Sequence, residues 1–259
     1  MRAVLTIVTL SARHQLAERG AIVSRAAFYA LILFVFSRLW GAVLEDVHEL
    51  PVRMDQLIWY LAITEWIVLS VPTLHAEIED EVRRGDLVYR LARPMAYPIA
   101  RLAEAFGALL VRMALLAVPG FGVAWLLTER LPTEPMFMLW LLPLGLCAGS
   151  LILLMMFAIG FTSLWLHDCR PLWWIWQKCA FVLGGMLLPL SLYPPWLQEV
   201  AAWTPFAALF HGPGGIALGV DSTGALWALI RLLAWLAVAT LVLTWAYRRS
   251  VRHIEIGGG

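Results

Sequence analysis

A few acids, histidines and cysteines in this sequence have types and spacings that metal or catalytic chemistry uses. His75 and Glu79 are four residues apart, so a helix would place both on one face as possible metal ligands. The triplet His167-Asp168-Cys169 offers three ligand types, but adjacent residues of a helix point to different faces. Neither set has a convincing third ligand, and the sequence contains no HExxH motif and no P-loop. We therefore predict no metal site, no catalytic site and no P-loop ATP site in this chain.

The densest group of charges lies in residues 76–98. Its acids come first and its arginines follow, which is the order that the dipole of a helix favours. Gly85 suits the end of one helix and Asp86 the start of the next, and Leu87 and Leu91 would give the second helix an apolar face. The segment therefore predicts two short helices joined at Gly85. They would either bind a partner protein or anchor lipid headgroups.

The composition is that of a protein embedded in a membrane. Of the 259 residues, 61% are hydrophobic and 14% are charged, whereas soluble domains have about 45–50% and about 25%. We expect an all-α integral membrane protein with one transmembrane domain over residues 1–259. The net charge of +1 gives no indication of nucleic-acid binding, and we expect Cys147, Cys169 and Cys179 to be free thiols.

Six apolar stretches are each near or above the roughly 20 residues that a transmembrane helix needs. Pro119 and Pro143 lie inside two of them, so we expect kinks or breaks there. Residues 1–25 predict an amphipathic helix in the plane of the membrane, or alternatively a solvated tail. Residues 192–220, rich in Pro and Gly, predict short re-entrant or interfacial helices at the outer face. The six expected spans are 26–44, 56–75, 99–127, 136–166, 172–190 and 224–247.

The arginines orient these spans. Most of them lie in the N-terminal segment, in the loops after the second and fourth spans, and in the C-terminal tail. Only Arg53 and Arg130 lie in loops on the opposite side. By the positive-inside rule, both termini are cytoplasmic. Lys178 is the only lysine in the chain, and this arginine bias fits a bacterial source.

Two charges fall in the middle of expected spans, Glu65 in the second and Arg112 in the third. Charges are costly in hydrocarbon, so both side chains should face protein or water. They are candidates for a buried ion pair with each other or for polar contacts in a translocation path. Arg112 has a further alternative, which is to reach a lipid headgroup.

The charged segment also carries a resemblance to a known family. The sequences RGDL at 84–87 and LARPM at 91–95 resemble the loop after the second span of ABC-2-type permeases, the membrane subunits of type V ABC exporters. The sequence FSRLWGAVL at 36–44 is similar to the aromatic end of the first span in that family. In architecture the whole chain resembles the stand-alone six-span subunits of about this length.

The resemblance implies a permease subunit of an ATP-driven exporter. Two permeases, identical or homologous, would pair, and each would dock a separate ABC ATPase subunit that holds ATP and Mg²⁺, with no cofactor in this chain. Segment 76–98 would be the cytoplasmic coupling helix that fits a groove on the ATPase. The residues that the resemblance assigns to this contact are Glu77, Glu79, Glu81, Arg83, Arg84, Gly85, Asp86, Arg90 and Arg93.

The same resemblance implies a multi-pass protein of the bacterial cytoplasmic (inner) membrane, surrounded by lipid. Two other classes of function stay open. A membrane-embedded enzyme would need a catalytic constellation, and a non-ABC carrier would work without an ATPase. The substrate is not readable from the residues, and export is favoured only by the resemblance.

Overall fold

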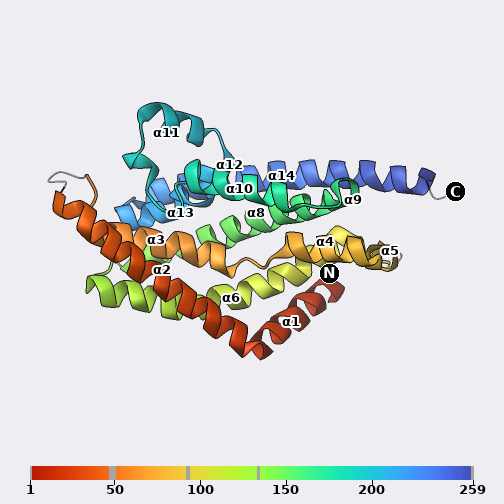
Figure 1. Ribbon diagram of the computed structural model, residues 1–259, viewed down its shortest axis with the longest axis horizontal. Helices are drawn as coiled ribbons and strands as arrows, with labels where there is room; N and C mark the ends of the chain where they lie inside the picture. The colour runs from red at the N-terminus through yellow and green to blue at the C-terminus, as the bar shows by residue number, and fades with distance from the viewer. Residues whose placement is uncertain (1, 47–50, 92–93, 133–134, 258–259) are drawn as a thin grey trace.

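The structure is a computed structural model that describes residues 2–46, 51–91, 94–132 and 135–257. Over these residues the chain is helical and has no β-strand. Five helices are long and apolar enough to cross a membrane, which confirms an all-α, multi-pass membrane protein. Their long axes run along the length of the molecule (Figure 1). They are α2 (Arg19–Asp46), α3 (Met54–Ser70, continued by α4), α6 (Tyr97–Thr128), α8 (Leu141–Phe161) and α14 (Ser222–Gly257).

The core of the bundle surrounds α3. Most residues of this helix are buried, including the large side chains of Trp59 and Tyr60. In contrast, α2 and α14 lie at the periphery and expose apolar side chains such as Phe28 and Trp227. An apolar surface on a spanning helix suits contact with lipid tails or with another membrane subunit.

The expected fifth span, residues 172–190, is not one continuous helix and is not among the five candidate membrane spans of the described residues. Helix α10 (Arg170–Val182) has 13 residues, or about 20 Å at 1.5 Å per residue. It ends before Gly184, where an added Cβ would lie 2.6 Å from the Phe210 ring, and Gly185 has a φ of +63°. Figure 1 shows the chain passing from the end of the bundle near α9 (Ser163–Leu166) to α11 (Pro195–Ala202) at the other end. The crossing therefore combines α10 with the non-helical residues after it.

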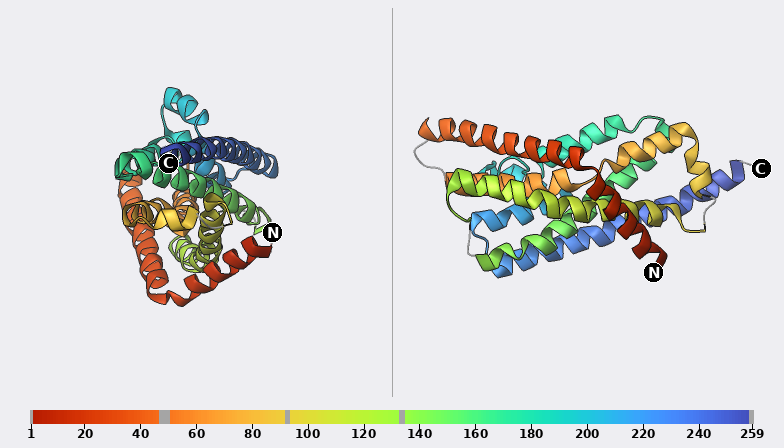
Figure 2. Two further views of the ribbon diagram at one scale, coloured as in Figure 1. Left: turned by 90° about the vertical axis from the view of Figure 1, so that its right-hand side faces the viewer. Right: turned by 90° about the horizontal axis from the view of Figure 1, so that it is seen from below.

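Helix α1 (Arg2–Ala17) lies obliquely across the bundle. It ends before Glu18, and α2 begins at Arg19, so the N-terminal helix is shorter than the expected 1–25 and the helix of the first span begins before residue 26. Seen from below (Figure 2), α1 crosses α6. The two helices approach closely because Gly107 has no side chain: an added Cβ would lie 2.4 Å from the Val8 carbonyl oxygen.

The charged segment folds as the sequence predicts. Helix α4 (Leu74–Arg84) and helix α5 (Asp86–Leu91) are joined at Gly85, which has a φ of +75°. Glycine suits this position since the left-handed region strains other L-residues. We call residues 74–91 the elbow; it lies at the end of the bundle where the C-terminus also lies (Figure 1).

Short helices also replace a long one before α14, as expected for residues 192–220. After the 3₁₀ turn η1 (Leu190–Leu192) and α11 come α12 (Pro205–Leu209), α13 (His211–Gly214) and η2 (Gly215–Leu218). In the fourth span, α7 (Pro135–Met138) precedes α8. Pro143 lies in the first turn of α8, where its missing N–H leaves no bond unmade, and α6 continues through Pro119.

Candidate functional site

The outer face of the elbow is polar and open. Arg84 has 73% of its side chain exposed and lies 4.0 Å from Asp80, a distance that gives only a weak ion pair. Tyr89 of α5 is 78% exposed. Gly85 and Asp86 between them are also exposed. An exposed aromatic side chain surrounded by charged residues is typical of a surface that binds a partner protein.

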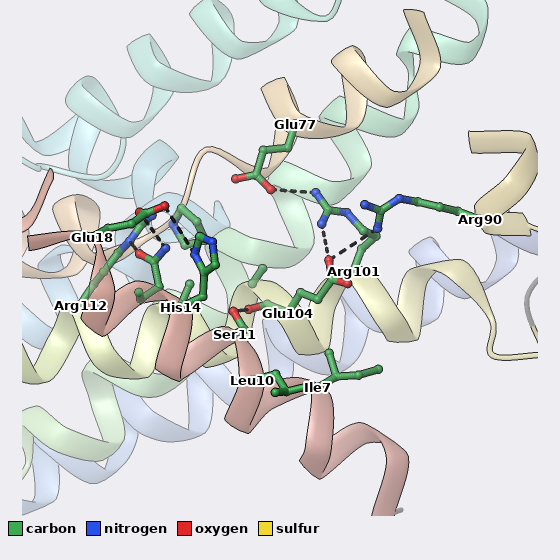
Figure 3. A pocket seen from close by; sticks show the side chains of 14 residues that line it. Ile7, Leu10, Ser11, His14, Glu18, Glu77, Arg90, Arg101, Glu104 and Arg112 are labelled. Atoms are coloured by element: carbon green, nitrogen blue, oxygen red, sulfur yellow. Dashed lines mark hydrogen bonds and ion pairs between the residues drawn. The ribbon is translucent and has the colours of Figure 1, made fainter. Parts of the chain in front are cut away.

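The inner face of the elbow is bound to α6 through Arg101, a buried guanidinium. Its Nη2 lies 2.7 Å from Glu77 Oε2 and 3.2 Å from Glu81 Oε1, and its Nη1 donates to Glu104 on its own helix. Tyr97 adds a second link, since its hydroxyl donates to Glu81 Oε2 at 2.8 Å. Figure 3 shows Arg101 between Glu77 and Glu104. Buried ion pairs of this kind fix geometry because breaking one leaves an uncompensated charge.

Helix α5 joins the same network through Arg90. Its guanidinium lies 3.4 Å from Glu81 and 3.7 Å from Glu104. Arg90 is about one-third exposed, so these pairs are weaker than those of Arg101. Leu87 is buried in the apolar core, and α5 is thereby held to the bundle by one charged side chain and one apolar side chain.

A second attachment runs from α4 to the loop before α10. The thiol of Cys169 donates to Glu79 Oε2 at 2.9 Å, and the Cys169 backbone N–H donates to the same oxygen at 3.2 Å. Burial, together with this bond to Glu79, raises the pKa of the Cys169 thiol to about 12. The other oxygen of Glu79 pairs with Arg83 at 2.5 Å. Hydrogen bonds from Arg170 lower the pKa of the neighbouring, partly exposed Asp168 to about 2.

The sequence profile of ABC-2 family transporter proteins matches residues 56–258 of this chain. The chain belongs to the ABC-2 transporter family. It is therefore a membrane-spanning permease subunit of an ABC transporter, whose partner is an ABC ATPase subunit. The matched region begins in α3 and includes the elbow, whereas α1 and α2 precede it. No curated protein and no solved structure matches the chain.

The structure divides the predicted contact residues of the permease into two groups. Arg83, Arg84, Gly85 and Asp86 lie on the exposed side of the elbow. Arg93 lies outside the described residues. The group that faces the bundle is Glu77, Glu79, Glu81 and Arg90.

Sequence reasoning missed the residues that hold the elbow from the other side, Tyr97, Arg101, Glu104 and Cys169, and the exposed Tyr89. A signal was available for two of them. Arg101 and Glu104 are spaced i, i+3 in the first turns of an apolar helix, where charges need partners.

Glu65 and Arg112 of the permease do not pair in the part of the chain that the structure describes. Arg112 Nε donates to Gln15 Oε1 of α1 at 2.6 Å. Glu65 is buried in α3 on the side of Tyr29, whose hydroxyl donates to the Ala62 carbonyl oxygen. The two charges therefore belong to different helix contacts, and the suggested pair is not formed.

The two sets of possible metal ligands meet where the Cys169 thiol donates to Glu79, but His75 has a different contact. The His75 ring stacks on Trp173, with 4.3 Å between ring centroids, while Glu79 is engaged by Arg83 and Cys169. Among the residues that the structure describes, no group of three or more His, Cys, Asp or Glu side chains could hold a metal ion.

Proposed function

We propose that this permease is the membrane subunit of an ATP-driven exporter and that the elbow is its coupling element. The observation that carries the proposal is the division of the elbow into an exposed face, with Arg84 and Tyr89, and an inner face bound to α6 by Arg101. A coupling element needs both: a surface that a partner can hold, and a rigid attachment that transmits the movement.

Two attachments lead from the elbow into the bundle. A displacement of α4 acts on α6 through Glu81 and Arg101, and on the start of α10 through Glu79 and Cys169. Both receiving segments are continuous with crossings of the bundle. Movement of the ATPase on the outer face would therefore shift two crossings together, which is how ATP binding and hydrolysis on the partner would reshape a transport path.

The complex that we propose contains two ABC ATPase subunits, which hold ATP and Mg²⁺, and two permeases, identical or homologous. The apolar faces of α2 and α14 offer surfaces for a second permease or for lipid. We place the complex in the bacterial cytoplasmic membrane with both termini in the cytoplasm, because the arginine-rich elbow and the C-terminus lie at the same end of the bundle (Figure 1).

The test is to purify the chain from its native host in mild detergent and to identify the proteins that come with it by mass spectrometry. We expect a stoichiometric ABC ATPase that is lost in the variants Arg84→Glu and Tyr89→Ala. The matched control is Arg130→Glu, an exposed arginine just beyond the far end of α6. A wild-type chain that purifies alone would favour a carrier or a membrane enzyme. Retention of the ATPase by both elbow variants would show that another surface holds it.

A further inference from the structure

A cavity of about 670 Å³ lies between α1, α6 and the elbow. Helix α1 contributes Ile7 and Leu10 to its wall as well as the polar His14 and Gln15, and α6 contributes Arg112 among others. Figure 3 shows these side chains around the cavity, with the Arg101 network at one end and Arg112 at the other. The two ends differ in charge.

At the elbow end, positive charge is fully compensated. Two guanidinium groups, those of Arg90 and Arg101, share the three carboxylates of Glu77, Glu81 and Glu104. An anion would meet no spare positive charge here.

At the α1 end, Arg112 has no carboxylate within 4.0 Å among the residues that the structure describes. Its side chain is 8% exposed and has Gln15 as its hydrogen-bond partner through Nε. Its Nη1 is buried without a partner. Arg25 of α2 is close enough to repel it. The acids that act on it from farther away are Glu77, which pairs with Arg101, and Glu18, which is engaged by His14 and Gln15. A buried, unpaired guanidinium is costly unless an anion completes it.

The cavity also reaches the apolar surface of α1. Leu10 lines the cavity and is 59% exposed, and Leu5 and Leu16 are exposed on the same helix. On a helix that lies along a membrane, exposed leucines enter the boundary between headgroups and acyl chains. An anion that arrives at Arg112 past Leu10 therefore comes from the headgroup layer of the bilayer.

We propose that the cavity under α1 is a binding site for the phosphate group of an anionic phospholipid, held by Arg112 with the Gln15 amide beside it. Guanidinium groups bind phosphate with paired, charge-assisted hydrogen bonds, and the free Nη1 supplies a donor. The lipid would fix α1 against α6 next to the Arg101 network. This inference requires only that α1 lie along a membrane surface, and it does not rest on the coupling role of the elbow.

The experiment is native mass spectrometry of the delipidated full chain in detergent, titrated with phosphatidylglycerol or phosphatidylcholine. Two variants remove the site in different ways. Arg112→Gln deletes the charge, and Gln15→Glu places a carboxylate beside Arg112 that competes with the lipid phosphate while keeping a link from α1 to α6. The matched control is Arg13→Gln, which removes an exposed arginine of the same helix that does not line the cavity.

We expect the wild-type chain and Arg13→Gln to bind phosphatidylglycerol about tenfold more tightly than phosphatidylcholine. Both site variants should lose this preference, and Gln15→Glu should do so without loss of thermal stability. Equal binding of the two lipids by the wild-type chain would overturn the proposal. An equal effect of Arg13→Gln and Arg112→Gln would overturn it too, since it would indicate general surface electrostatics.

A further titration with inorganic phosphate separates the two sources of the anion. We expect millimolar phosphate to leave bound phosphatidylglycerol in place. If phosphate instead binds with the same dependence on Arg112 while phosphatidylglycerol does not, the site takes a soluble anion and the lipid assignment is wrong.

Discussion

The Cys169 thiol donates to the Glu79 carboxylate, with 2.9 Å between Sγ and Oε2, although the two residues are 90 positions apart in the chain. This contact joins the elbow to the loop before α10. Together with the Arg101 network, it means that the elbow is bound on two sides, by α6, which follows it in the chain, and by the loop before α10.

The first prediction concerns the reactivity of Cys169. Cys169 is fully buried, and burial together with Glu79 raises the pKa of its thiol to about 12. Since the thiolate is the nucleophile, the folded chain should react very slowly with maleimide at pH 8. With Cys147→Ser and Cys179→Ser as background, Glu79→Gln removes the neighbouring negative charge and lowers the pKa. The fraction of thiolate at pH 8 then rises, and the labelling rate should increase about tenfold or more.

Timed labelling followed by mass spectrometry measures this rate. The control is Arg83→Gln, which removes the other partner of Glu79 but leaves its charge; its rate should not rise. If Arg83→Gln speeds labelling as much as Glu79→Gln, local loosening and not the pKa governs the reaction.

The second prediction compares a buried and an exposed arginine. Arg101→Gln leaves Glu77, Glu81 and Glu104 without their main cation, so the free energy of unfolding should fall by about 3–5 kcal/mol. Arg84→Gln removes an exposed, distant pair and should cost less than about 1 kcal/mol. Thermal unfolding of the purified chain, followed by tryptophan fluorescence, measures both.

A second substitution checks the cause. Adding Glu81→Gln to Arg101→Gln removes one of the carboxylates that has lost its cation and should restore part of the lost stability. Equal melting temperatures for the two single variants would contradict the anchoring role of Arg101.

The elements that could be predicted from the sequence are those that depend on local rules. The length of the apolar stretches is enough to predict α2, α3, α6 and α14. Gly85 predicts the junction of α4 and α5, because a left-handed φ favours glycine in any fold. The break at Gly184 could not be read in the same way. An added Cβ at Gly184 would meet the carbonyl oxygen of Ala180 in α10 and the ring of Phe210, which lies between α12 and α13. The contact with Phe210 exists only in the folded chain.

The candidate site shows the same division. The charged segment was recognisable as a unit, but its inward residues were not separated from its outward ones. A local signal existed within α4: Ile78 is apolar and buried, and Glu81 lies three residues later on the same side of the helix. The spacing of Arg101 and Glu104 indicated that α6 needs polar partners, but neither Arg101 nor Cys169 could be assigned to the elbow, because only tertiary packing brings them there.

The third prediction concerns the contact of α1 with α6. An added Cβ at Gly107 would lie 2.4 Å from the Val8 carbonyl oxygen, so Gly107→Ala should push α1 away and cost about 1–3 kcal/mol. Gly122→Ala is the matched control, because it lies in the same helix with nothing within 4 Å. It should be neutral or slightly stabilising, since alanine favours helix.

Limited trypsin digestion at Arg13 reports the position of α1 directly, alongside the melting temperature. Cleavage should be faster in Gly107→Ala than in Gly122→Ala. The same cleavage rate in both variants would mean that α1 is not held by this contact.

The last prediction separates the role of Gly85 in coupling from its effect on stability. Gly85 and Gly219 both have a positive φ, +75° and +85°, and nothing lies within 4 Å of an added Cβ at either position. Valine at each position should therefore lower the free energy of unfolding by a similar amount from backbone strain alone, about 1–2 kcal/mol.

If the elbow transmits movement from the ATPase, Gly85→Val should strongly reduce the transport-dependent ATPase activity of the complex, because it changes the angle between α4 and α5. Gly219→Val should leave that activity near the wild-type level, and Gly85→Asn should retain most of it since asparagine tolerates this region. Equal loss of activity in the two valine variants at matched stability would show that the elbow is not the coupling element.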